Sequence, residues 1–128
     1  MSDHATTDTR EIIVEILLSL EKGQDFSHKL MKAVLDKYDY LDPREKAFIK
    51  RVTEGTIERQ LELDYYLDRF SSVPVRKMKP LIRCLLRMST YQILYMDAVP
   101  DSAVCNEACK LAAKRAVSYT HLRAHETR

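Results

Sequence analysis

Apolar residues recur every three or four positions along most of this chain, which is the spacing of an amphipathic α-helix. The first such stripe ends close to Gly23, a residue type that often terminates helices in a left-handed conformation. Its apolar members are Ile13, Ile16, Leu17 and Leu20. Asp8 and Glu11 have the spacing of a capping box at the start of this helix, after a polar segment. We therefore predict a frayed N-terminus over residues 1–8, followed by a first helix.

Two further helix starts are marked by capping residues. Ser27 can cap a second helix, and Asp42 can cap a third with Pro43 at the first helical position and Glu45 further in. The helical pattern then continues to about Phe70, although a break near Gly55 or within residues 61–64 is compatible with it. A close approach of two helices would explain Gly55. Residues 71–74 are predicted to form a loop.

The C-terminal half predicts two more helices and no strand. One runs from about Arg76 to Met96, with Pro80 tolerated in its first turn. The other, Ala103–Ala116, follows a break and new cap at residues 100–102, and it carries Val104, Ala108 and Leu111 on one face. Five or six amphipathic helices with short connections predict an all-α helical bundle.

Composition supports one compact domain and excludes several classes of protein. The chain has 128 residues and a net charge of +2, with only two glycines and four prolines. These numbers argue against β-sandwiches and leave too few glycines for a nucleotide-binding loop. Every apolar run is too short to span a bilayer, and no secretory leader is recognisable at the start. Three cysteines fit a reducing compartment, so we expect a cytoplasmic protein without a membrane partner.

The residues that could perform chemistry all have simpler explanations. Cys105, Cys109, His121 and His125 approximate the ligand spacing of a zinc finger, but cysteines four positions apart on a helix are more often small core residues. Cys84 lies among apolar helical positions, without a convincing histidine base. Glu62 and Asp64 fall on different faces of a helix, so they do not form an acid–base pair. We therefore predict no metal site and no catalytic residue in this chain.

One face of the predicted helix 76–96 is basic. Its cations fall within an arc of about 80° opposite the apolar residues, at spacings of about one helical turn. They are Arg76, Lys79, Arg83 and Arg87. Charged residues opposite a core stripe are commonly just solvated, and that is one interpretation. The other is a row of cations that contacts successive RNA phosphates. A membrane-surface role is weaker because the opposite face is needed for the core.

Several motifs together resemble those of the NusB-like family. They are Leu85–Tyr95 with the letters LLRMSTYQILY, then Val99-Pro100, the segment Asn106–Lys114, the segment Asp42–Tyr65, and Arg10 at the head of the first helix. The resemblance covers residues 9–116. It implies an all-helical domain of two small helical subdomains, of which the family's last helix would be missing here. Loss of that helix would make the chain only marginally stable.

Two kinds of protein carry this domain. One is the stand-alone transcription antitermination factor, which binds boxA RNA together with a ribosomal protein. The other is the RsmB type of 16S rRNA cytosine-C5 methyltransferase, in which the domain precedes the catalytic part and assists RNA binding. Three details favour the second: Gln92 where antitermination factors usually have glutamate, an N-terminal region with Arg10 as its only arginine, and similar sequence at 41–48, 77–80 and 101–108.

The resemblance also implies what this chain lacks. Methylation needs a glycine-rich loop for S-adenosylmethionine and a Pro-Cys nucleophile, and neither motif is present. We therefore expect S-adenosylmethionine in a full-length protein but no cofactor in this chain. Residues 117–128 resemble one translated reading frame of a transposon-end sequencing adapter, so we expect an artefactual tail after Ala116.

The resemblance and the basic stripe together predict an RNA-binding accessory domain that positions 16S rRNA for a catalytic domain outside this chain. The candidate RNA-binding residues are Arg10, Arg76, Lys79, Arg83 and Arg87. Arg87 has an alternative role, since it could bond helix-end carbonyls instead. Two other functions stay open: a free-standing antitermination factor, with boxA RNA and a ribosomal protein as partners, and a helical protein-interaction module that binds no RNA.

Overall fold

The computed structural model describes residues 3–97 and 99–126, and the side chains of residues 9–97 and 99–114. In this part of the chain every regular element is helical, which confirms the all-α prediction. The elements are α1 (Asp3–Glu21), α2 (His28–Lys37), α3 (Pro43–Glu58), α4 (Gln60–Phe70), the 3₁₀ turn η1 (Val75–Lys77), α5 (Pro80–Tyr95) and α6 (Asp101–Glu126).

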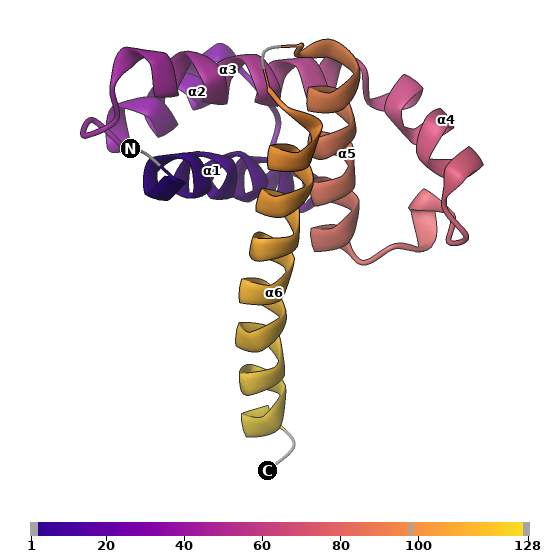
Figure 1. Ribbon diagram of the computed structural model, residues 1–128. Coiled ribbons are helices and arrows are strands. Elements are labelled where there is room, and N and C mark those ends of the chain that lie inside the picture. Colours follow the sequence, from indigo (N-terminus) through magenta and orange to yellow (C-terminus); the bar gives the residue numbers. More distant parts are fainter. Residues whose placement is uncertain (1–2, 98, 127–128) are drawn as a thin grey trace.

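Helix α5 lies at the centre of the molecule and packs against α1, α3, α4 and α6 (Figure 1). The helices share a single core, to which α1, α3, α4, α5 and α6 all contribute. The most deeply buried apolar side chains come from these helices: Ile13, Ile49, Val52, Leu63, Met88 and Leu111. Each of them is an apolar residue in the helical periodicity of the sequence, so their burial is the main stabilising contribution.

Three predicted helix boundaries are confirmed. Gly23 has φ 105°, the left-handed conformation that ends α1. The hydroxyl of Ser27 accepts a hydrogen bond from the Leu30 amide at 3.0 Å and caps α2. At α3, the Asp42 carboxylate accepts from the Glu45 amide at 2.9 Å, and the Glu45 side chain accepts from the Asp42 amide at 3.0 Å. These caps satisfy backbone donors that have no partner within the helix.

Two boundaries in the N-terminal half differ from the predictions. Helix α1 begins at Asp3, so residues 3–8 extend the helix instead of fraying. No glycine or proline occurs in these residues, and nothing in their backbone chemistry ends a helix. The long helical segment from residue 44 to 70 is interrupted at Arg59, where φ and ψ are −105° and 21°. The break therefore lies between the two places that the sequence suggested.

The largest difference lies at the start of the predicted helix 76–96. Arg76 belongs to the turn η1, and α5 starts only at Pro80. Proline restricts the residue before it to extended backbone, and Lys79 accordingly has φ −63° and ψ 144°. Pro80 thus occupies the first position of the helix, which starts four residues later than predicted. As a result, Arg76 and Lys79 do not share the helix of Arg83.

Helix α6 is longer than the predicted 103–116, because it extends from Asp101 to Glu126. Val104 and Leu111 are buried, as the stripe predicted. Cys105 and Cys109 are exposed, so their prediction as core residues is wrong; they lie on the opposite face of this helix. The proposed artefactual tail, 117–128, has its side chains outside the described residues.

Gly55 marks a close approach between α3 and α5, as one interpretation of the sequence suggested. A β-carbon at this position would collide with the ring of Tyr91 on α5. Glycine therefore lets the two helix backbones approach each other. Among the described residues, no helix combines the length and apolarity required to cross a membrane.

Candidate nucleic-acid interface

The five candidate RNA-binding cations occupy two different kinds of environment. Arg10 on α1 is almost completely buried, with 2% of its surface exposed. Its Nε and Nη2 donate to Oε1 of Gln92 at 3.1 and 2.9 Å, and its guanidinium lies 5.2 Å from the ring centre of Phe48. Burial lowers the pKa of Arg10, and the charge of Glu107 opposes this shift. Arg10 therefore connects α1, α3 and α5 inside the protein.

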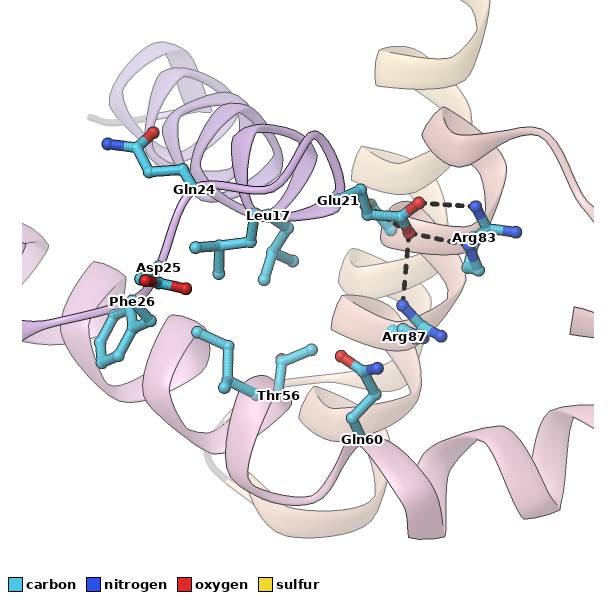
Figure 2. Close-up of a pocket in the computed structure, with 12 residues that line it drawn as sticks. Leu17, Glu21, Gln24, Asp25, Phe26, Thr56, Gln60, Arg83 and Arg87 are labelled. Atoms are coloured by element: carbon cyan, nitrogen blue, oxygen red, sulfur yellow. Dashed lines mark hydrogen bonds and ion pairs between the residues drawn. The ribbon is translucent and has the colours of Figure 1, made fainter. Parts of the chain in front are cut away.

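Arg83 forms hydrogen bonds with all three of its guanidinium nitrogens. Nε and Nη2 donate to the two carboxylate oxygens of Glu21 at 2.7 and 2.6 Å, a bidentate pair that Figure 2 shows at the end of α1. Nη1 donates to the backbone carbonyls of Val75 and Met78 at 3.0 and 2.9 Å. Arg83 therefore fixes the turn η1 to the end of α1.

Arg87, one turn further along α5, makes the second bidentate pair. Its Nε and Nη2 donate to Asp64 on α4 at 2.7 and 2.8 Å, and its Nη1 donates to Glu21 at 3.3 Å. The side chains of Arg83 and Arg87 are only 15% and 12% exposed. We call Glu21, Asp64, Arg83 and Arg87 the ion cluster. Arg87 thus binds carboxylates and not the helix-end carbonyls that the alternative prediction gave it.

The ion cluster is electrically balanced. Hydrogen bonding to Arg83 is the largest influence on the pKa of Glu21 and lowers it, with the charges of Arg83 and Arg87 acting in the same direction. Glu21 consequently stays ionised at neutral pH, and two carboxylates face two guanidinium groups. The cluster can therefore hold α1, α4 and α5 together, but it adds little positive potential for a phosphate.

A cleft of about 450 Å³ opens beside the ion cluster (Figure 2). Its apolar lining comes from Leu17, Leu20, Phe26 and Ile57, and its polar edge includes Gln24 and Gln60. Cys84 lies in its wall, where burial and the neighbouring Glu21 raise the pKa of the thiol to about 12. The thiol is protonated at neutral pH, so it offers no nucleophile to the cleft.

The remaining candidates, Arg76 and Lys79, are exposed at the edge of the molecule together with Lys77. Their backbone is held in place, because the Val75 amide donates to Oδ1 of Asp68 at 2.8 Å. Within the part of the chain that the structure describes, Arg76 and Lys77 take part in no ion pair. We call Arg76, Lys77 and Lys79 the basic turn. The sequence-based prediction missed Lys77, because it placed this residue on a continuous helix outside the basic arc.

The predicted single exposed stripe is therefore wrong. Acidic residues distant in sequence pair with Arg83 and Arg87, and the helix that was to carry all four cations begins only at Pro80. Arg10, the fifth candidate, is bonded to Gln92 inside the protein. Whether any of the five residues contacts RNA stays a prediction. No group of three metal-binding side chains occurs among the described residues, and His121 and His125 lie outside those side chains.

The NusB family model matches residues 7–120, which includes all six α-helices at least in part. The chain belongs to the NusB family. The match covers the motifs that carry the resemblance in the sequence and extends beyond Ala116, the expected end of the domain. It also includes the ion cluster and the basic turn, so both lie within the family domain.

Curated relatives of this NusB-family chain fall into two groups. The chain is 36% identical over 109 residues to a protein of Bacillus subtilis named a probable ribosomal RNA small subunit methyltransferase B, and 27% identical over 103 residues to one of the same name from Synechocystis. These alignments cover 85% and 80% of this chain but 24% and 23% of the relatives. The chain therefore spans about a quarter of their length.

The second group consists of proteins named transcription antitermination protein NusB. That of Macrococcus caseolyticus is 28% identical over 109 residues, covering 84% of this chain and 81% of the relative. That of Acetivibrio thermocellus is 27% identical over 105 residues, covering 81% and 72%. No solved structure matches the chain significantly. The comparisons thus give the family but do not decide between the two kinds of relative.

Proposed function

We propose that this NusB-family chain is the RNA-binding accessory domain of an rRNA cytosine-C5 methyltransferase, and that it positions 16S rRNA for a catalytic domain elsewhere in the cytoplasmic enzyme. The observation that carries this proposal is the 36% identity to the methyltransferase relative of Bacillus subtilis over 85% of this chain. The alignment covers 24% of that relative, as an accessory domain would.

The basic turn supplies the phosphate contacts in this proposal. Arg76 and Lys79 are the two predicted RNA-binding residues with exposed side chains, and Lys77 joins them on a backbone fixed by Asp68. Cations held on a rigid turn bind successive phosphates at a low entropic cost, because little of the backbone has to become ordered. Arg83 acts indirectly, since it donates to the carbonyls of Val75 and Met78, which flank Arg76 and Lys77 in the chain.

In this proposal the methylation chemistry belongs to a catalytic domain outside this chain. A site for S-adenosylmethionine needs a glycine-rich turn that lets the backbone approach the ligand. Gly55 faces Tyr91 inside the bundle, and Gly23 ends α1, so neither residue forms such a turn. The cofactor and the nucleophile therefore belong to the catalytic domain in this proposal, and this domain contributes only RNA binding and orientation.

A titration of the chain with a 16S rRNA fragment at several salt concentrations tests the RNA-binding part. Three phosphate contacts predict a slope of log affinity against log salt concentration of about −2, because each contact releases about 0.7 counterion from single-stranded RNA. Absence of binding at low salt, or an affinity that does not change with salt, would contradict the proposal. It would favour the protein-interaction module instead.

The antitermination function is the second candidate, because the two relatives of this kind described above are covered over 72% and 81% of their own length. In that case the chain would bind boxA RNA together with a ribosomal protein. The gene sequence downstream of codon 116 separates the two candidates. A methyltransferase domain in the same reading frame supports the accessory domain, whereas a stop codon soon after one further helix supports the antitermination factor.

A further inference from the structure

The cleft beside the ion cluster combines apolar walls with polar side chains that have no protein partner. Leu17 of α1 and Ile57 of α3 contribute apolar walls. Asp25, in the loop after α1, and Gln60, the first residue of α4, lie at opposite ends of the cleft (Figure 2). Neither side chain has a hydrogen-bond or ion-pair partner among the described residues. Apolar walls with a few polar groups are typical of a site that binds a small molecule or a ring.

Thr56 adds a buried polar group to the wall of the cleft. Figure 2 shows its side chain directed from α3 into the cleft, and the residue is 1% exposed. Its hydroxyl has no hydrogen-bond partner in the described part of the chain. Most buried hydroxyl groups are hydrogen-bonded, because burial takes away their bonds to water. Thr56 can therefore donate a hydrogen bond to a ligand or accept one from it.

The ion cluster lies between this cleft and a second recess, which reaches the basic turn. Arg83 and Arg87 line both recesses, and the second has a volume of about 410 Å³. Arg76 of the basic turn lines the second recess, together with Asp64 and Asp68. Both of these carboxylates are already hydrogen-bonded to other residues. A strand whose phosphate binds Arg76 therefore has the ion cluster, and the cleft beyond it, as its next surroundings.

Charge decides which part of a nucleotide the cleft can accept. The ion cluster is balanced, and Asp25 adds a further carboxylate at the other end of the cleft. A phosphate would therefore gain little there. A nucleobase is neutral, and its faces are apolar enough to pack against Leu17 and Ile57. Its edge carries the donors and acceptors that Gln60 and Thr56 can bond.

We propose that the cleft beside the ion cluster binds one unstacked base of a single-stranded RNA, while Arg76 holds a phosphate of the same strand. The base lies against Leu17 and Ile57, and its edge bonds the amide of Gln60 and the hydroxyl of Thr56. A single strand fits because its bases can leave the stack at low cost. This proposal rests on the proposed RNA-binding function and names the part of the nucleotide that is recognised.

An apolar side chain of a partner protein is the other group that could enter such a cleft. It would cover Leu17 and Ile57, but it would leave the hydroxyl of Thr56 without a bond and would remove water from the amide of Gln60. A base covers the same walls and bonds both polar groups. A protein partner is therefore an outcome of the test and not the proposal.

The test measures the fluorescence anisotropy of a labelled oligouridylate, and of an abasic oligomer of the same length, as the chain is added. The two probes have the same phosphates, but only the first has bases. The variants are Thr56→Val, Gln60→Ala and the two changes together. Thr53→Val is the matched control for the first, because the hydroxyl of Thr53 is also buried and unpartnered but lies outside the cleft. Gln24→Ala is the control for the second, because the amide of Gln24 points away from the cleft in Figure 2.

We expect the double variant to bind oligouridylate on the order of tenfold more weakly, because it loses the hydrogen bonds to the base edge. Its affinity for the abasic oligomer, and its slope of affinity against salt, should equal those of the unmodified chain, because no cation is changed. Each single variant should show part of the loss, and the two controls should show none. Thr56→Val should also unfold at the temperature of the unmodified chain, because its hydroxyl has no bond to lose.

Two results would overturn base binding in the cleft while leaving RNA binding intact. One is an unchanged affinity of the double variant for oligouridylate, which would leave the cleft to a protein side chain. The other is an equal loss for the abasic oligomer, which would show that the cleft residues do not bind a base. If the unmodified chain binds neither probe at low salt, the proposed function fails as well, so the two failures are distinguishable.

Discussion

The ion cluster and the basic turn contain cations that the sequence places on one stripe, yet the structure uses them differently. Arg83 and Arg87 each form a bidentate pair with a carboxylate of another helix, and their side chains are 15% and 12% exposed. Arg76 and Lys77 are exposed and take part in no ion pair within the described part of the chain. A cation's role therefore depends on which distant acidic residue the fold brings to it, and not on its own position along a helix.

The largest expected effect on stability lies at Arg10, which is buried and bonded inside the protein, as the cations of the ion cluster are. Arg10→Met should lower the free energy of unfolding by about 3 kcal/mol, because it leaves the buried Oε1 of Gln92 without its charged donor and removes the guanidinium that Glu107 attracts. Urea denaturation followed by circular dichroism measures the change. The matched control, Arg76→Met, should stay within about 0.5 kcal/mol of the unmodified chain. Equal effects at the two positions would contradict the difference between buried and exposed cations.

The ion cluster should respond next. Arg87→Gln should cost about 2 kcal/mol, because Asp64 loses both of its charge-assisted hydrogen bonds while it is mostly enclosed. The same urea measurement applies, with Lys77→Gln as the control in the basic turn. A cost at Arg87 as small as that at Lys77 would mean that the cluster is solvated and contributes no stability.

Acid should weaken the ion cluster in a defined pH range. The folded-state pKa of Glu21 lies below its ordinary value of 4.5, chiefly because Arg83 bonds the ionised form. A carboxyl group with a lowered folded-state pKa stabilises the fold above its unfolded pKa, and this contribution disappears as the pH falls through the folded value. The free energy of unfolding should therefore decrease as the pH falls below about 4.5.

Glu21→Gln sharpens this test. The variant should be less stable at about pH 7 than the unmodified chain. It should also lose less stability between about pH 5 and about pH 3, a range that brackets the titration of Glu21. Glu58→Gln, at an exposed position of α3, is the control and should keep the original pH profile. An identical profile for both variants would show that Glu21 does not contribute to the acid sensitivity.

The smallest expected effect on stability, and the largest on RNA binding, concerns the basic turn. The triple variant Arg76→Gln, Lys77→Gln and Lys79→Gln should unfold within about 1 kcal/mol of the unmodified chain, because exposed charges contribute little to folding. Thermal unfolding checks this point before any binding experiment. A larger loss of stability would mean that these cations are structural, like those of the ion cluster.

Local chemistry could be predicted from the sequence to a large extent. The caps at Ser27 and Asp42 and the stop at Gly23 depend on residues within a few positions, and the structure confirms all three. The all-α class followed from the same short-range pattern. The start of α5 was also readable in principle, since proline restricts the residue before it and thus separates Lys79 from the helix.

The candidate site could be predicted much less well, because it depends on contacts between distant residues. Glu21 meets Arg83 across 62 positions of the sequence, and Arg10 meets Gln92 across 82. Nothing in the periodicity of either helix shows which acid a cation will find. The exposed face of α4 was missed for a related reason: Tyr65, Tyr66 and Phe70 fit a helical pattern, but the pattern does not say how exposed each side chain is in the described fold.

The salt dependence of RNA binding tests the central claim most directly, namely that the basic turn and not the ion cluster contacts phosphates. The triple variant of the basic turn should be compared with a triple control that neutralises the exposed Lys22, Lys29 and Lys50 by the same change to Gln. We predict that the slope of log affinity against log salt concentration falls from about −2 to near zero in the first and stays unchanged in the second. Equal slopes in the two variants would contradict the account.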